Sequence, residues 1–232
     1  RRVLFRSDWS VAGQAHEGGL AAGVDTLAID NGQMMLDVLP TRGMGIHKLR
    51  MKNDVELRTV GWQSPIRGPV HPAFVDLGEP SGLGWLDGFD EFFVRCGLES
   101  NGAPDFDAKS GKLLYPLHGR IANRPAYDVQ LTVDTDKQEI SIRGLVEETR
   151  FHFQKLRMTS TITTKFGSTS FHVRDEIENA SSVPATMQML YHINFGLPLL
   201  DAGSRVVAPV KTLVPRTPRA ARSEEHTSEL QS

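Results

Sequence analysis

Apolar and polar residues alternate along much of the second half of the chain. Val129, Leu131 and Val133 alternate with polar neighbours, and the alternation resumes at Ile140 after the polar run 134–138. Successive side chains of a β-strand point to opposite faces, so a period of two indicates a half-buried strand. The pattern predicts two strands joined by a turn.

The same period continues toward the C-terminus. The apolar positions of 151–153 have the opposite phase from those of 156–162, which predicts a β-bulge or bend near Gln154–Lys155. Apolar residues alternate with charged ones over 171–177, and Ala185–Phe195 follows Pro184 as a further apolar strand. We therefore expect a run of consecutive strands here, rich in β-branched residues that favour pleated sheets.

The first half is less regular. Met35–Leu39 and Ile46–Leu49 are predicted strands, and a turn at 52–54 precedes another at Val55–Val60. From Gly61 to Arg124 glycine and proline are frequent and periodicity is weak, as is typical of a segment that carries function. Many strands without intervening helices predict an all-β fold, a large antiparallel β-sandwich.

Composition restricts the class of protein. The 232 residues, 39% of them hydrophobic, suit one large domain. A net charge of -2 does not favour nucleic acid or an acidic membrane surface as a partner. Apolar runs are too short for a membrane span, no secretory signal opens the chain, and the single Cys96 excludes an intramolecular disulfide. These features predict a cytoplasmic protein.

The two ends differ from the rest. Residues 222–232 resemble the translation of a common sequencing-library adapter, and residues 1–7 resemble the translation of its opposite strand. We expect both to be non-native tails flanking a partial domain at 8–221, which would then lack elements at its C-terminus and at its N-terminus.

His118 and Arg120 lie close together at the end of the irregular segment. A guanidinium offers a rigid fork of donors and an imidazole a donor or an acceptor, a mixture that suits a ligand rich in hydroxyl groups. The alternative is a loop histidine bonded to backbone, with Arg120 in a surface ion pair.

His192 and Asn194 are two residues apart in a predicted strand, so their side chains point to the same face. Tyr191, Ile193 and Phe195 point to the other. Two polar groups on one side of an apolar strand make a suitable cleft wall. The alternative is a buried histidine satisfied by Asn194 or by a nearby carbonyl.

Two further groups are candidates. Trp85 and the phenylalanines that follow can supply an aromatic platform for a sugar ring, while Asp90, Glu91 and Arg95 can bind hydroxyl groups. The alternative is a set of core aromatics beside solvated acids. Arg42 occupies the tip of a turn after a predicted strand. The histidines show no metal-ligand spacing and no nucleophile elbow is present, so neither metal nor cofactor is expected.

Several of these segments, in this order, resemble the aldose 1-epimerase-like subfamily of the galactose mutarotase superfamily. The resemblance covers most of Val24–Val214 and is carried by the segments Leu39–Ile46, Trp85–Glu91, Arg95–Asn101, Pro116–Asn123 and Leu190–Leu199. It implies a two-sheet sandwich with a sugar cleft on one concave sheet.

The resemblance also implies roles. In mutarotases a glutamate takes the proton of the anomeric hydroxyl while a histidine protonates the ring oxygen. His192 matches that general acid and His118 the histidine that helps to hold the sugar, while Arg42, Arg120 and Asn194 match ligand-contacting positions. The base lies late in the chain of the relatives, so we expect it beyond residue 221.

The expected function is therefore that of an isomerase acting on an aldose or sugar derivative, with the fragment itself lacking its base. One alternative is a carbohydrate-binding module without turnover. Another is an isomerase or lyase acting on an oxidised or acidic sugar, since one fold can host several chemistries.

Overall fold

The computed structural model describes residues 2–6 (backbone only), 8–52, 57–62, 68–209, 211–212, 214–215, 217–218 and 221. Contacts divide the chain into two compact units, Arg1–Asp201 and Ala202–Ser232. Every strand assigned to the described residues belongs to the first unit. No helix in the described part of the chain has the length and apolar character needed to cross a bilayer.

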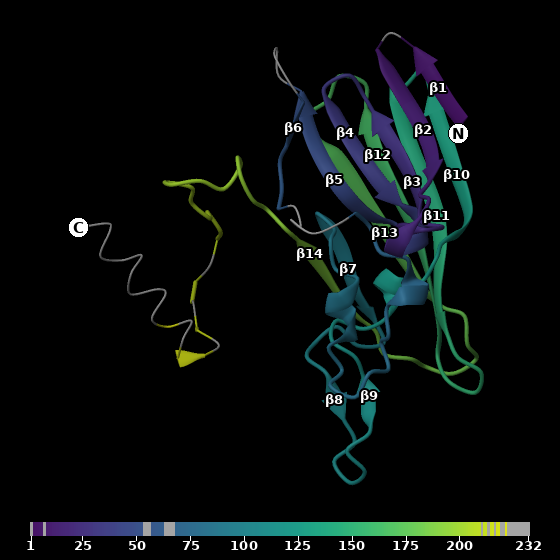
Figure 1. The fold of residues 1–232 in the computed structure, drawn as a ribbon, viewed down its shortest axis with the longest axis vertical. Helices are drawn as coiled ribbons and strands as arrows, with labels where there is room; N and C mark the ends of the chain where they lie inside the picture. The colour runs from purple at the N-terminus through teal and green to yellow at the C-terminus, as the bar shows by residue number, and fades with distance from the viewer. Residues whose placement is uncertain are drawn as a thin grey trace. The chain divides into compact units, whose positions relative to one another are not determined.

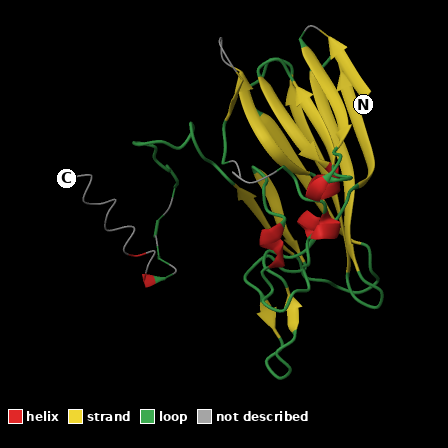
Figure 2. Cartoon of the chain, in the orientation of Figure 1, coloured by secondary structure: helices red, strands yellow, loops and turns green. Residues whose placement is uncertain are grey.

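The first unit is built from strands and short 3₁₀ turns (Figures 1 and 2). The strands are β1 (Arg2–Arg6), β2 (Trp9–Ala15), β3 (Asp25–Asp30), β4 (Met34–Leu39), β5 (Gly45–Lys52), β6 (Leu57–Thr59), β7 (Phe93–Leu98), β8 (Asp105–Phe106), β9 (Leu113–Tyr115), β10 (Tyr127–Asp134), β11 (Glu139–Thr149), β12 (Lys155–Lys165), β13 (Phe171–Asn179) and β14 (Gln188–Ile193). The 3₁₀ turns are η1 (Gly19–Ala21), η2 (Pro40–Arg42), η3 (Pro72–Phe74), η4 (Gly84–Asp87) and η5 (Ile121–Asn123).

Two large antiparallel sheets form a sandwich. One has the order β1-β2-β3-β4-β5-β7-β14, with β6 paired to β5, and the other has the order β10-β11-β12-β13. The main core takes Leu36, Val38 and Ile46 from the first sheet and Ile140 and Ile142 from the second. Figure 1 shows the two sheets as facing layers, with the β8–β9 hairpin below them. The predicted all-β sandwich is confirmed.

Alternation predicted the second sheet well. Residues of β11 and β12 alternate between buried and partly exposed along all eleven positions of each strand, because one face packs on the core. Of the two alternatives predicted near Gln154–Lys155, the bend is confirmed and the β-bulge is not found. The phase changes there because β11 ends at Thr149 and residues 150–154 turn the chain into β12.

The sequence prediction missed β7. All six of its residues are buried, since one face packs in the main core and the other under the segment that contains Trp85. A strand buried on both faces shows no alternation. β14 is shorter than the predicted Ala185–Phe195, and the predicted turn at 52–54 lies largely outside the described residues.

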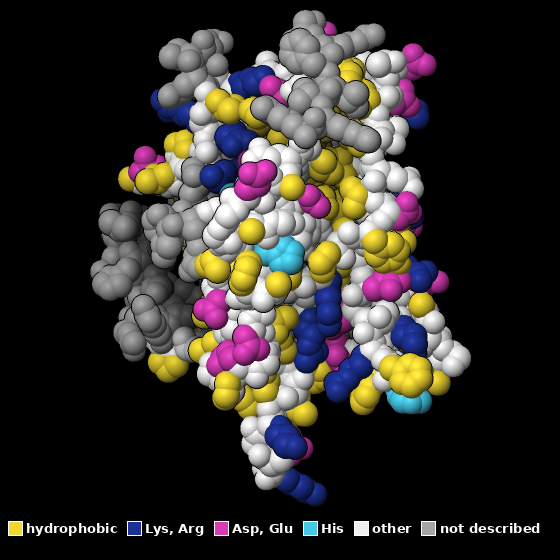
Figure 3. Space-filling model, turned by 45° about the vertical axis from the view of Figure 1, so that its right-hand side comes forward, with side chains coloured by type: hydrophobic (Ala, Val, Ile, Leu, Met, Phe, Trp, Pro, Cys, Tyr) yellow, Lys and Arg dark blue, Asp and Glu magenta, His cyan; other side chains and the backbone are white. Residues whose placement is uncertain are grey.

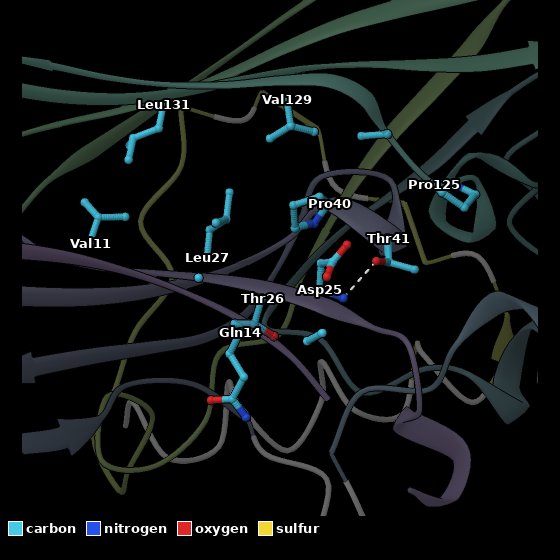
Figure 4. Close-up of a pocket in the computed structure, with 13 residues that line it drawn as sticks. Val11, Gln14, Asp25, Thr26, Leu27, Pro40, Thr41, Pro125, Val129 and Leu131 are labelled. Atoms are coloured by element: carbon cyan, nitrogen blue, oxygen red, sulfur yellow. Dashed lines mark hydrogen bonds between the residues drawn. The ribbon is translucent and has the colours of Figure 1, made fainter. Parts of the chain in front are cut away.

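The two sheets separate where β10 faces β2 and β3, leaving a hollow of about 660 Å³. Figure 4 shows Val129 and Leu131 of β10 on one side, with Val11, Leu27 and Pro40 opposite. The side of the molecule turned forward in Figure 3 exposes hydrophobic side chains among charged ones. None of the predicted site residues lines this hollow.

Candidate functional site

The structure brings His118 and His192 together. Their ring centroids lie 5.5 Å apart, with an angle of 72° between the ring planes. His192 belongs to β14, where it is opposite Val94 of β7. His118 comes from the irregular segment that follows β9. The two histidines predicted from separate motifs therefore lie side by side.

Backbone contacts hold the His118 segment against β7. The Gly97 amide donates to the His118 carbonyl at 3.1 Å, and the Arg120 amide donates to the Gly97 carbonyl at 2.9 Å. His118 itself has a left-handed φ of 58°, and Gly119 has a φ of 73°. A Cβ on Gly119 would lie 2.0 Å from the Ser100 carbonyl oxygen, so this turn requires glycine.

The hydrogen bonding of His118 sets its tautomer. Its Nδ1 lies 3.0 Å from the Asn101 carbonyl oxygen, which can only accept, so Nδ1 carries the hydrogen. The neutral ring therefore presents Nε2 as an acceptor.

His192 is partly buried, and its Nδ1 has no hydrogen-bond partner among the described residues. Burial, followed by the neighbouring His118, lowers the pKa of His192 below its ordinary value, and the nearby Asn194 side chain opposes this shift. The neutral ring is thus favoured near pH 7. A buried ring nitrogen without a partner beside a second histidine can take or give a proton in contact with a ligand.

Aromatic rings surround the pair. Trp85 contacts His118 edge to face, with centroids 4.7 Å apart, and Phe89 contacts His192 in the same way at 5.4 Å. Phe89 stacks between Trp85 and Trp62, at 4.7 and 5.4 Å. Trp85 is only 1% exposed, so it supports the histidines, whereas Trp62 is 37% exposed. Sequence reasoning missed Trp62, which has no periodic neighbours to mark it.

Arg42 and Glu91 are buried partners. Arg42 Nε donates to Glu91 Oε1 at 2.7 Å, Nη2 donates to the Gly88 carbonyl at 3.0 Å, and Nη1 bonds Asn123 Oδ1. The other Glu91 oxygen accepts the Asp90 amide at 3.0 Å. These contacts tie the segment containing Phe89 to η2 and η5, so both residues position the aromatic ring.

Asp90 and Asn194 complete this support. Asp90 Oδ2 lies 3.1 Å from Nε2 of His47 on β5. Asn194 donates through Nδ2 to the Glu91 carbonyl at 2.8 Å, and its amide donates to the Phe92 carbonyl at 2.8 Å. Asn194 thus continues the β14–β7 pairing and fastens the same segment.

Arg95 and Arg120 are placed differently from the pair. Val94 of β7 faces Trp85, and the next residue, Arg95, points to the opposite face of the strand. The Arg95 guanidinium contacts Asp175 of the other sheet, so Arg95 points into the sandwich. Arg120 donates through Nη1 to Glu99 at 3.2 Å and through Nη2 to a backbone carbonyl. The structure does not bring Arg95 beside His192.

Glu148 was not predicted as a functional residue. It lies at a buried position of β11 and accepts the amides of Leu98 and Glu99, at 2.9 and 3.3 Å. Burial raises the pKa of its carboxyl group. With Arg120 it lines a hollow of about 300 Å³. Within the described residues, no carboxylate is recorded in hydrogen-bond contact with His118 or His192, and no group of three or more metal-ligating side chains is found.

A sequence model of the family described as "Domain of unknown function (DUF4432)" matches residues 21–232. A search of curated proteins finds no match.

A crystal structure described as "a putative aldose 1-epimerase from Klebsiella pneumoniae subsp. pneumoniae MGH 78578" is similar, with 36% sequence identity and a TM-score of 0.78. The similarity covers 87% of this chain and 51% of that one, so the chain spans about half the length of the matched structure. The aldose 1-epimerase-like resemblance of the sequence is thereby confirmed.

Proposed function

The chain belongs to the family described as Domain of unknown function (DUF4432), and on that premise we propose that it binds an aldose or sugar derivative at His118 and His192. The observation that carries the proposal is the 5.5 Å pairing of the two rings inside an aromatic enclosure. The similarity to a structure described as a "putative aldose 1-epimerase" supports the sugar as ligand class.

The proposed chemistry is the acid half of anomer interconversion. His192, as imidazolium, donates a proton to the ring oxygen, and the bond between that oxygen and the anomeric carbon breaks as the anomeric hydroxyl loses its proton to a solvent water molecule. The aldehyde rotates, and the reverse proton transfers close the ring on its other face. A lowered pKa makes the imidazolium a stronger acid, and the Nε2 acceptor of His118 can bind a sugar hydroxyl.

The proposal assigns no proton acceptor to this chain. No described carboxylate is recorded in contact with either ring. This observation favours a second candidate function, carbohydrate binding without turnover. An isomerase or lyase acting on an acidic sugar uses the same site and differs only in its substrate.

The experiment measures exchange between the α and β anomeric proton signals of glucose and galactose by NMR, with and without the chain. We expect the exchange to be faster with the chain and to return to the uncatalysed rate with His192→Asn. His172→Asn is the matched control, because His172 is exposed on β13.

Unchanged exchange in His192→Asn would exclude His192 as the acid. If the unmodified chain broadens the sugar signals without speeding exchange, and His192→Asn removes the broadening, the binding function replaces the enzymatic one. The absence of both effects with all sugars contradicts the proposal.

A further inference from the structure

The outer face of the eight-stranded sheet carries a third hollow, of about 510 Å³, which neither His118 nor His192 lines. Its volume is in the range of small-molecule sites. We call it the β2–β5 hollow; its lining residues on the strands and β2–β3 loop are Ser10, Ala12, Gln14, His16, Thr26, Ala28, Asp30, Met35, Asp37, His47, Lys48 and Arg50, with Gly68 and Pro69 at its margin.

A β-bulge places two consecutive side chains in this hollow. Asp37 of β4 is opposite Lys48, whereas the next residue, Val38, is opposite Ile46, so His47 is the extra residue on β5. In a regular strand His47 and Lys48 would point to opposite faces, yet both line the hollow. The bulge therefore brings an imidazole and an ammonium group to one face of the sheet.

The two acids that line the hollow, Asp30 and Asp37, both have cationic partners. Both Asp30 oxygens accept from Lys52 Nζ, at 2.8 and 2.7 Å, and Asp37 accepts from Nη2 of Arg50. Each acid is thereby paired. The Lys48 ammonium makes no hydrogen bond or ion pair with any described residue, so it is available to an anionic ligand.

A second donor at this wall also lacks an acceptor. The Nε atom of Arg50 is buried and has no hydrogen-bond partner in the described part of the protein. A buried donor without an acceptor costs free energy, and a charged donor gains most from an anionic acceptor. Lys48 and Arg50 together therefore suit a carboxylate or a phosphate group.

The rest of the lining suits hydroxyl groups. Ser10, Ala12 and Ala28 are small, so the sheet surface is open to a ring. His16 Nε2 lies 2.8 Å from Thr26 Oγ1. Burial, and then the nearby His47, lower the pKa of His16, so its neutral ring can exchange hydrogen bonds with hydroxyl groups near pH 7.

We propose that the β2–β5 hollow binds a polyhydroxylated anion, either a sugar acid or a sugar phosphate. The anionic group contacts Lys48 and the Arg50 guanidinium, and the hydroxyl groups contact His16 and Thr26. The hollow is separate from the histidine pair, so this proposal does not depend on the function proposed above.

Methyl NMR of the full chain tests it. The chain has seven methionines, so ¹³C-methyl methionine gives a simple spectrum. Met35 lines the hollow, and Met158 lies in the main core as an internal reference. Glucuronate, glucose 6-phosphate, glucose, acetate and inorganic phosphate are titrated separately, and Met35→Leu assigns the signal. We expect the first two probes to shift Met35 at lower concentration than the other three, with Met158 unmoved. The tighter of the two identifies the anion source.

Two lysine variants separate the site from general charge effects. Lys48→Gln should weaken the binding of glucuronate and of glucose 6-phosphate about tenfold, as expected for loss of a charge-assisted hydrogen bond. Lys112→Gln, at an exposed lysine before β9, should bind like the unmodified chain. An unshifted Met158 signal shows that each variant is folded.

His192→Asn should leave the Met35 titration unchanged, which keeps failure of this proposal distinct from failure of the sugar site. The proposal is overturned if no probe shifts Met35, if Lys48→Gln binds like the unmodified chain, or if glucose binds as tightly as glucuronate.

Discussion

Arg95 of β7 and Asp175 of β13 form a buried ion pair that joins the two sheets. Arg95 Nε and Nη2 donate to the two carboxylate oxygens at 2.6 and 2.9 Å, and neither side chain has exposed surface. Nη2 also donates to Ser160 of β12, and Nη1 donates to the Met44 carbonyl. Nearly every donor of the guanidinium is therefore used inside the sandwich.

Removing one partner of this pair should strongly destabilise the fold. Asp175→Ala leaves a buried guanidinium without its counter-ion, so we expect a loss of about 3–5 kcal/mol in the free energy of unfolding. Urea unfolding measures it. In the control, Glu176→Ala removes one partner of an exposed pair with Arg174 and should cost about 1 kcal/mol or less. Equal losses in the two variants would contradict the assignment.

The lowered pKa of His192 predicts how stability depends on pH. Its folded pKa lies below the unfolded value of 6.5, so the unfolded chain binds the proton more tightly. The stability that the neutral His192 ring contributes to the folded chain is complete above pH 6.5. It is lost as the pH falls through the folded pKa. We expect His192→Asn to lose less stability than the unmodified chain between pH 7 and pH 5, as measured by urea unfolding. The pKa of His16 is also lowered, but His16 is present in both the unmodified chain and His192→Asn, so its effect is the same in the two profiles. Parallel pH profiles would refute the prediction.

Gly119 should tolerate no side chain. A Cβ there would overlap the carbonyl oxygens of Ser100 and Gly97, and it would displace His118 from β7. Gly119→Ala should abolish NMR contacts between the His118 and His192 rings. Gly111→Ala is matched in backbone, with a φ of 66°, but has open space around the new Cβ. It should cost only about 1–2 kcal/mol for the left-handed conformation and keep the ring contacts.

The Cys96 thiol should be inert in the folded protein. Burial, followed by the negative charge of Glu91, raises its pKa to about 12, so almost no thiolate is present at pH 8. A thiol-specific chromogenic reagent should therefore react slowly with the native chain and rapidly in urea. Rapid native reaction would show that the β7–η4 packing around Cys96 opens readily.

Much of the second sheet could be predicted because β11 and β12 each have one face in the core and one toward solvent, which the sequence records as alternation. β7 could not be predicted, since both its faces are buried. The alternating phenylalanines of 151–153 have the pattern of a strand, but Phe151 is 81% exposed in a turn. Alternation alone does not distinguish an exposed turn from a pleat.

The residues of the candidate site were also predictable only in part. His118 and His192 could be named from their sequence neighbourhoods, and the resemblance raised both above the structural alternative. The sequence did not show which of the other predicted residues lie beside the two histidines. Arg42 and Arg95 are equally polar in sequence, and only their burial and their partners, Glu91 and Asp175, show what each contacts.

The sequence by itself determined the all-β class and the strands of the second sheet and named two candidate histidines, because these depend on local periodicity and on chemical type. Only the tertiary structure decided that the histidines meet, that Arg95 points between the sheets, and that a bulge turns His47 and Lys48 to one face. The physical reason is that burial and the choice of hydrogen-bond partner depend on residues far apart in the chain, which local patterns do not record.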